Sequence, residues 1–148
     1  MIDVLWTETT AQRRQAGEWL SERLEGNPNY EVSDLFAAGV VNDGTNILAV
    51  VAYHTYFPSS GTVQLSVAAD TPKWATKRVL KELLGFPFRV LGCNKAWAAC
   101  RFDNTRAIQF NQRLGMTREA ILRQHFGPNT HAVIQSMLLR EYEKSRWV

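Results

Sequence analysis

Residues 104–123, NTRAIQFNQRLGMTREAILR, decide the fold of this chain. Asn104 is a favourable helix N-cap, because its side-chain oxygen can accept a hydrogen bond from a backbone amide of the first turn. Gly115 is the residue type that most often ends a helix. Apolar residues recur between them at helical spacing and would face inward: Ala107, Phe110 and Leu114. The stretch therefore predicts a helix that ends at Gly115 and is followed by a strand.

The segments before this stretch predict another strand and another helix. Residues 95–102 read as the strand that leads into the helix. Further upstream, Asp70-Thr71-Pro72 predicts a helix start, with Thr71 as N-cap and Pro72 at the first helical position. The buried stripe of that helix would be Ala75, Val79, Leu80, Leu83 and Leu84.

A hairpin and a third strand come before that helix. Residues 37–41 and 46–57 are strand-like, and Asp43-Gly44 between them is a hairpin-turn signal. Residues 62–67 alternate with period two. One face of this strand would carry Val63, Leu65 and Val67, and the other Thr62, Gln64 and Ser66.

The N-terminal part predicts a strand and a helix. Residues 1–7 alternate weakly, as an edge strand does. Thr9 and Gln12 then fit a capping box, in which each side chain bonds the backbone of the other residue. Gly26-Asn27-Pro28 would stop this helix. Residues 29–35 carry no assignable pattern.

Two closing strands, over residues 118–126 and 131–140, flank the turn residues Gly127-Pro128-Asn129. The whole order is β-α-β-β-β-α-β-α-β-β. Such an order predicts a single α/β domain, residues 1–148, in which helices pack on a mixed sheet.

Composition is that of an ordinary globular protein. The 148 residues are 45% hydrophobic and 21% charged, which suffices to bury one core. No apolar run reaches the roughly 20 residues that a membrane span needs. The N-terminus lacks the basic and apolar regions of a signal peptide. We therefore expect a cytoplasmic protein without a membrane partner.

Charge and cysteine content exclude further classes. Cys93 and Cys100 show neither C-x-x-C spacing nor a clustered histidine, which argues against a disulfide framework or a metal site. The net charge of +3 suits a polyanionic ligand. The basic residues are spread out rather than gathered in a block, so that nucleic-acid binding is disfavoured.

Over about residues 43–142, the chain resembles the GNAT N-acetyltransferases. Residues 104–123 resemble the family stretch N-x-x-[SA]…L-G-F-x-x-E-G-x-L-R, with Met116 in place of Phe and Ala120 in place of Gly. The match is closest to the branch of ribosomal-protein N-terminal acetyltransferases. The resemblance implies a mixed, mostly antiparallel sheet of about six to seven strands flanked by helices. It also implies acetyl-CoA as co-substrate and an amine, such as a protein N-terminus, as acceptor.

The cofactor loop of the family, Val followed by [RQ]-x-x-G-x-[GA], is degenerate in this chain. Val67 aligns with the family valine, whereas Ala75 and Lys77 stand in place of two glycines. A helix N-terminus still binds anions through its unpaired amides and partial positive charge. We therefore expect a pyrophosphate against the amides of residues 73–77. Basic side chains would add charge there: Lys73, Lys77 and Arg78.

The resemblance implies further cofactor contacts. The strand before the loop is expected to splay from the strand over 95–102, so that the pantetheine arm adds along its exposed edge. The expected cofactor-binding residues are Val67, Ala69, Lys73, Trp74, Ala75, Thr76, Lys77, Arg78, Asn104 and Ala107. Simpler roles compete with these: the basic residues as a solvated helix face, Trp74 as a core residue and Asn104 as a helix cap.

No residue stands out as a catalytic acid or base. Asn111 occupies the position at which many GNAT relatives carry a tyrosine acid, and an amide cannot act as a general acid. Ser66 shows no His or Asp partner in the sequence. The candidates are Ser66, Asn111 and Glu119, with His54 and Glu31 as further candidate bases. Each also suits a surface or structural role.

The absence of a strong base bears on the acceptor. An α-amino group titrates near 7.7–8.0 and lysine near 10.4, so that near pH 7.5 about a third of the former is neutral but only roughly a thousandth of the latter. The sequence therefore favours an α-amine or another weakly basic amine.

Two hypotheses of different class follow. The first is an acetyl-CoA-dependent N-acetyltransferase that needs no metal. The second is a non-catalytic GNAT-like interaction or structural module that binds CoA weakly or not at all, because the loop glycines and the tyrosine are missing. A small nucleic-acid binder rests on the pI near 9.1 alone. The terminal strand could pair with a second copy in a homodimer.

Overall fold

The computed structural model describes residues 1–24 and 35–148. The strands are β1 (Asp3–Trp6), β2 (Ala37–Asn42), β3 (Ile47–Phe57), β4 (Thr62–Ala69), β5 (Lys95–Arg101), β6 (Thr117–Leu122) and β7 (Ala132–Leu138). The helices are α1 (Thr10–Arg23), α2 (Lys77–Gly85), α3 (Thr105–Leu114) and α4 (Leu139–Glu143). Two short helical turns, η1 (Pro72–Trp74) and η2 (Phe86–Val90), flank α2.

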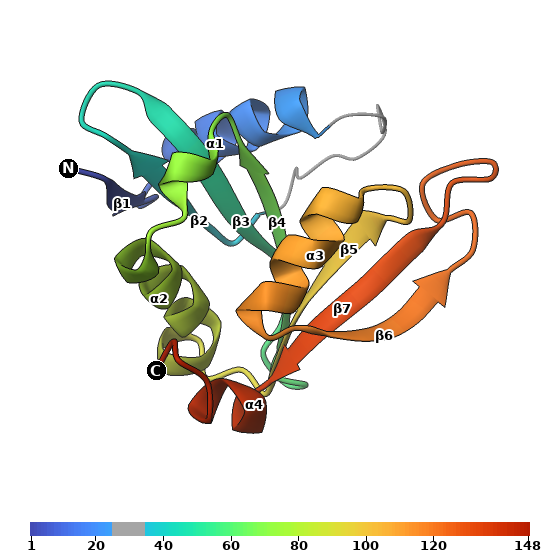
Figure 1. Cartoon of the computed structure of the whole chain (residues 1–148). Coiled ribbons are helices and arrows are strands. Elements are labelled where there is room, and N and C mark those ends of the chain that lie inside the picture. The colour runs from blue at the N-terminus through green and yellow to red at the C-terminus, as the bar shows by residue number, and fades with distance from the viewer. Residues whose placement is uncertain (25–34) are drawn as a thin grey trace.

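All of these strands belong to one sheet, in the order β1-β2-β3-β4-β5-β7-β6 (Figure 1). Neighbouring strands run antiparallel except β4 and β5, which run parallel. The segment that carries α2 joins these two, as a parallel pair requires a crossover connection. The predicted fold class, a mixed and mostly antiparallel sheet flanked by helices, is confirmed.

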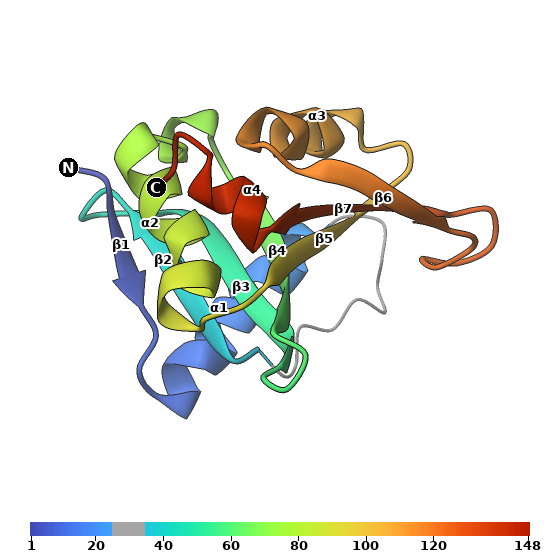
Figure 2. The same ribbon diagram turned by 90° about the horizontal axis from the view of Figure 1, so that it is seen from below.

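The helices cover both faces of the sheet (Figure 2). Because side chains of a strand alternate between its faces, β3 and β4 contribute to two separate cores. The core under α1 contains Ala16, Leu20, Val50, Ala52 and Ala68. The larger core under α2 and α3 contains Val51, Tyr53, Val63, Leu65, Leu83 and Leu114. The predicted alternation of β4 is confirmed, but its polar face is also buried, with Gln64 and Ser66 each 7% exposed.

The predicted ends of two helices are confirmed. Thr9 Oγ1 accepts a hydrogen bond of 3.1 Å from the Gln12 amide, and Gln12 Oε1 accepts one of 3.1 Å from the Thr9 amide, which completes the capping box of α1. Asn104 Oδ1 accepts from the Ala107 amide at 3.2 Å and so caps α3. Gly115 ends α3 with φ 110°, a left-handed conformation that glycine adopts without steric cost.

The helix predicted from residues 71–72 begins later. Thr71 caps only η1, where its Oγ1 accepts from the Lys73 amide at 3.3 Å. Thr76 is the N-cap of α2, and its Oγ1 accepts from the Val79 amide at 3.2 Å. Two capping threonines five residues apart therefore divide the segment into a single turn and a separate helix.

Other boundaries differ in detail from the prediction. β6 ends at Leu122 rather than near residue 126, because residues 123–131 form a loop. β7 ends at Leu138, and α4 occupies the following residues that were predicted as strand. On α3, Ile108 is buried, whereas Ala107 and Phe110 are half-buried.

The predicted helix stop at Gly26-Asn27-Pro28 and the candidate base Glu31 lie outside the described residues. None of the helices in residues 1–24 and 35–148 is long and apolar enough to cross a membrane.

Candidate functional site

β4 and β5 separate along their length. Their ladder contains three residue pairs: Thr62↔Lys95, Val63↔Ala96 and Gln64↔Trp97. β4 continues to Ala69 and β5 to Arg101, and no further pair joins them within the described residues. The other edges stay paired, β4 with β3 and β5 with β7. The predicted splay is thus present, and beyond Gln64 it leaves an unpaired strand edge to which an extended group could add.

The loop after β4 uses several of its own amides. The Ala75 amide donates to the Pro72 carbonyl at 3.3 Å, and the Thr76 amide donates to the Trp74 carbonyl at 2.9 Å. The Lys73 amide is bonded to Thr71, as described above. Three of the five amides that were predicted to bind a pyrophosphate therefore already have acceptors.

The N-terminus of α2 offers other donors. In the described part of the chain, the amides of Lys77 and Arg78 have no acceptor, because the intrahelical bonds begin with Leu80 to Thr76. Unpaired amides and the positive end of the helix dipole favour an anion at this point. Within the expected site, residues 73–77, Lys77 therefore keeps an amide without an acceptor in the described part of the chain, as does the adjacent Arg78.

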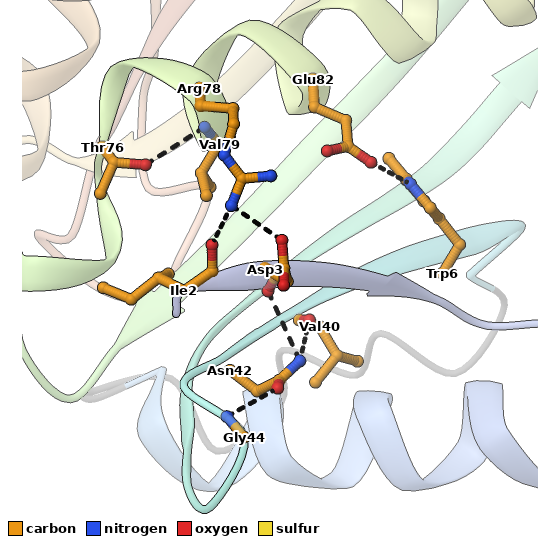
Figure 3. Close-up of polar contacts among 10 residues, drawn as sticks. All are labelled: Ile2, Asp3, Trp6, Val40, Asn42, Gly44, Thr76, Arg78, Val79 and Glu82. Carbon is orange, nitrogen blue, oxygen red and sulfur yellow. Dashed lines mark hydrogen bonds and ion pairs between the residues drawn. The ribbon is translucent and has the colours of Figure 1, made fainter.

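The basic side chains around this helix start differ in their partners. Arg78 Nη2 forms an ion pair of 2.7 Å with Asp3 Oδ1 and also donates to the Ile2 carbonyl, so that it ties α2 to β1 (Figure 3). Lys73 and Lys77 are exposed and have no carboxylate within ion-pair distance among the residues described. Two of the three predicted charges therefore remain available to a ligand.

Trp74 is a core residue. Its side chain is 6% exposed, and its ring centroid lies 5.6 Å from that of Phe110 on α3. Val67 and Ala75, two further predicted contacts, pack against the same core. The Trp74–Phe110 contact joins the loop after β4 to the helix after β5, and therefore forms part of the wall between the two separated strands.

The N-terminus of α3 carries the remaining predicted cofactor contacts. Asn104 is exposed, and its Oδ1 is used as the helix cap of Ala107. Its side-chain amide NH₂ group remains as a donor. The preceding Asp103 is paired with Arg101 at 3.1 Å, which lowers the pKa of that carboxyl.

A histidine–serine pair lies on the opposite face of the sheet, the face that α1 covers. His54 Nε2 is 2.7 Å from Ser66 Oγ, and His54 Nδ1 is 3.0 Å from Thr55 Oγ1. Burial lowers the pKa of His54 from 6.5 to about 4, so that the ring is neutral at pH 7. The prediction that Ser66 lacks a histidine partner is wrong. Counting back from the β3–β4 turn does not reveal it, because Phe57 pairs with Thr62 but a register shift then pairs His54 with Gln64 rather than with Leu65.

The surroundings of this pair are strained. Thr55 has φ 51°, which is rare for a β-branched residue, and the register of β3 and β4 shifts between His54 and Phe57. Bulges and strained backbone cluster at functional sites. Ser66 lies two residues beyond the last β4–β5 pair. The strained pair therefore lies where the strands begin to separate.

The other two predicted catalytic residues are engaged elsewhere. Asn111 Nδ2 donates to Gln135 Oε1 at 3.1 Å and contacts Cys100 Sγ at 3.5 Å. Glu119 pairs with Lys95 at 2.7 Å and accepts from Ser136 Oγ at 2.9 Å. The hydrogen bonds from Lys95 and Ser136 lower the pKa of Glu119. In the described part of the chain, Asn111 and Glu119 therefore belong to hydrogen-bond clusters separate from the His54–Ser66 pair.

No model of a known protein family matches this sequence, and no curated protein matches it. Solved structures do match. A chimera of the Vibrio cholerae spermidine N-acetyltransferase superposes with a TM-score of 0.74 and 16% identity, over 96% of this chain and 98% of that one. A putative acetyltransferase gives a TM-score of 0.64 and 22% identity over 72% of this chain. A putative acetyltransferase from T. thermophilus gives 0.63 and 21%, also over 72%.

The chain spans about three fifths of the two putative acetyltransferases, with 59% and 61% of their lengths covered. At these identities the likeness establishes the fold. The chain has the GNAT fold of the acetyltransferases, and the likeness does not extend to any one branch of them.

Proposed function

We propose that this chain transfers an acetyl group from acetyl-CoA to an amine. The observation that carries the proposal is the opening between β4 and β5, because the loop that follows β4 leads to the unpaired amides at the start of α2. The extended thioester arm of the cofactor needs an open strand edge, and its pyrophosphate needs unpaired backbone amides. The fold of the solved acetyltransferases supports the same assignment.

Acetyl-CoA supplies an activated acyl group: the amine nitrogen adds to the thioester carbonyl carbon, and the carbon–sulfur bond then breaks. The proton that the nitrogen loses ends on the sulfur, so that CoA leaves as its thiol. The amides of Lys77 and Arg78, with the ammonium groups of Lys73 and Lys77, would hold the pyrophosphate. Val67, Ala69, Asn104 and Ala107 border the opening in the proposal. Backbone amides on the open edge of β4 would stabilise negative charge on the carbonyl oxygen.

The His54–Ser66 pair would orient the acceptor. Neutral His54 can accept the Ser66 hydroxyl proton, and in the proposal this bond fixes the Ser66 hydroxyl relative to the amine. The pKa of about 4 keeps His54 uncharged at neutral pH, so that it does not repel a protonated amine as it approaches. We assign this orienting role to Ser66 and His54, and not to the other two predicted catalytic residues, Asn111 and Glu119.

The same low pKa bears on the class of acceptor. A base is most effective when its pKa lies near the working pH, and the pKa of His54 lies well below it. The amine must therefore lose its proton largely by itself, which an α-amino group does far more readily than a lysine. We propose an α-amine, such as a peptide or protein N-terminus, as acceptor, the substrate type that the ribosomal-protein branch would also use.

Calorimetric titration with acetyl-CoA tests the proposal. Lys77→Glu should raise the Kd about tenfold, because it places a negative charge beside the pyrophosphate at the helix start. Lys81→Glu makes the same charge change one turn further along α2 and is the matched control, with an expected effect of about twofold or less. If the unmodified protein takes up no acetyl-CoA at millimolar concentration, the proposal is wrong.

A second candidate function, a non-catalytic module of the same fold, is favoured by the contact between Trp74 and Phe110 and by the intrachain bonds of the loop amides. The ring contact reduces the space for a cofactor, and the intrachain bonds reduce the number of backbone amides that could donate to it. The titration separates the two functions, because the module predicts no saturable uptake of acetyl-CoA.

A further inference from the structure

The loop between β6 and β7 surrounds a hollow that none of the preceding assignments uses. It has a volume of about 830 Å³. Its polar lining is Arg123, Gln124, His125, Asn129 and His131, and its apolar lining is Ile121 and Leu122. Among the described residues, no acidic side chain belongs to this lining. The hollow thus presents cationic and hydrogen-bonding groups together with two apolar side chains.

Hydrogen bonds within the loop connect three of these residues, Gln124, Asn129 and His131. The Gln124 amide donates to His131 Nδ1 at 2.8 Å, and the Asn129 amide donates to Gln124 Oε1 at 3.2 Å. Gln124 and Asn129 both have left-handed backbone, with φ 53° and 54°. For glutamine such a conformation is unusual, and backbone strain of this kind gathers at binding and catalytic sites.

The hydrogen bond to His131 also settles its tautomer. Because Nδ1 accepts the Gln124 amide proton, the ring proton of neutral His131 lies on Nε2, which is therefore a donor. Arg123 adds a permanent positive charge. No carboxylate lies within ion-pair distance of Arg123 in residues 1–24 and 35–148. A cation without a counter-ion beside an imidazole donor is complementary to an oxyanion.

The hollow adjoins the end of the sheet at which β4 and β5 separate. The Phe102 amide, one residue beyond β5, donates to the His131 carbonyl at 2.9 Å, and the two rings lie 5.5 Å apart. Because β4 and β5 are parallel, their carboxyl-terminal ends lie at the same end of the sheet. The hollow and the opening therefore lie at the same end of the sheet.

We propose that the β6–β7 hollow binds a carboxylate or phosphate group of the acceptor. This inference rests on the proposed function, in which an amine acceptor reaches the β4–β5 opening. The acceptor is then an amine that also carries an oxyanion and an apolar body, since Ile121 and Leu122 are 56% and 38% exposed at the hollow. A simple polycation lacks the anionic group and would be repelled by Arg123.

An NMR titration with inorganic phosphate tests the site without requiring any transfer activity. The backbone amides of residues 123–131 and the ring signals of His125 and His131 should shift and saturate at millimolar phosphate. Arg123→Gln should weaken this binding at least about fivefold, because it removes the permanent charge. Arg118→Gln is the matched control, an exposed arginine of β6 that does not line the hollow, and should leave the Kd unchanged.

Repeating the titration with saturating acetyl-CoA identifies the source of the anion. Phosphate should still bind, because the hollow belongs to the acceptor. Displacement of phosphate by acetyl-CoA would assign the hollow to the cofactor and overturn the inference. Shifts that never saturate, or that persist unchanged in Arg123→Gln, would also overturn it. A failure of acetyl-CoA to bind would leave the phosphate result intact and count only against the proposed function.

Discussion

At the scale of single residues, burial of His54 has consequences beyond the proposed reaction. Its ring nitrogens contact two hydroxyl groups, on Thr55 and Ser66. Desolvation by burial lowers the pKa of the ring. A protein that keeps a neutral histidine buried must lose stability in acid.

The expected loss can be measured on His54→Gln. Between pH 6.5 and 4 the unfolded chain binds a proton at His54 that the folded chain does not, so stability falls as the pH drops through this window. By pH 5 the loss amounts to about 1–2 kcal/mol. Urea unfolding at pH 7 and pH 5 should show this loss in the unmodified protein and little of it in His54→Gln, which keeps a polar group near Ser66.

His125→Gln serves as the control for that measurement, because it makes the same substitution at an exposed histidine. The window above pH 5 also avoids Glu119, whose pKa is lowered, so that its contribution is lost only as the pH falls below 4.5. An equal pH dependence in His54→Gln and in the unmodified protein would contradict the burial of a neutral ring.

At the scale of elements, the two capping threonines decide where α2 begins. Thr71 and Thr76 have the same side chain, but the first caps one turn and the second caps nine residues of helix. Thr76→Ala should cost about 1 kcal/mol of unfolding free energy, the usual value for a lost N-cap, and Thr71→Ala clearly less. Urea denaturation of both variants measures the difference. A larger loss for Thr71→Ala would mean that the helix begins at Pro72 after all.

This pair of threonines also shows what the sequence can predict. Caps, turns and apolar periods are local, so α1, α3, the β2–β3 hairpin and the alternation of β4 were all predicted correctly. Thr71-Pro72 and Thr76 are equally good local starts. The helix begins after Thr76 because Trp74 is buried in the core against Phe110, a contact with a residue 36 positions further along the chain.

The candidate site was less predictable than the elements, because its side chains meet through tertiary contacts. Ser66 and His54 were both noted as candidates, but only the register of the hairpin places them 2.7 Å apart. Asn111 fits a family position for an acid, yet its amide lies next to Gln135, which is 1% exposed and needs a hydrogen-bond partner. Such pairings depend on which faces the helices cover, which no local pattern encodes.

At the scale of the whole molecule, the sheet consists of two parts, β1–β4 and β5–β7, that are joined by a ladder of three residue pairs. The core under α2 and α3 connects the two parts on one face, and Trp74 and Phe110 belong to that connection. A ligand between β4 and β5 would supply backbone partners that the strands themselves lack. Binding should therefore change the protection of both strand edges together.

Hydrogen–deuterium exchange with saturating acetyl-CoA makes this prediction specific. Peptides that cover residues 65–69 and 77–79 should exchange at least about tenfold more slowly, because a bound ligand adds its binding free energy to the cost of local opening. Peptides of β1 and β2 should exchange at unchanged rates, since β3 separates these strands from the opening. Lys77→Glu at the same acetyl-CoA concentration should lose protection in both segments at once. Protection of residues 77–79 without residues 65–69 would mean that an anion binds at the helix start while the opening between the strands stays closed to the ligand.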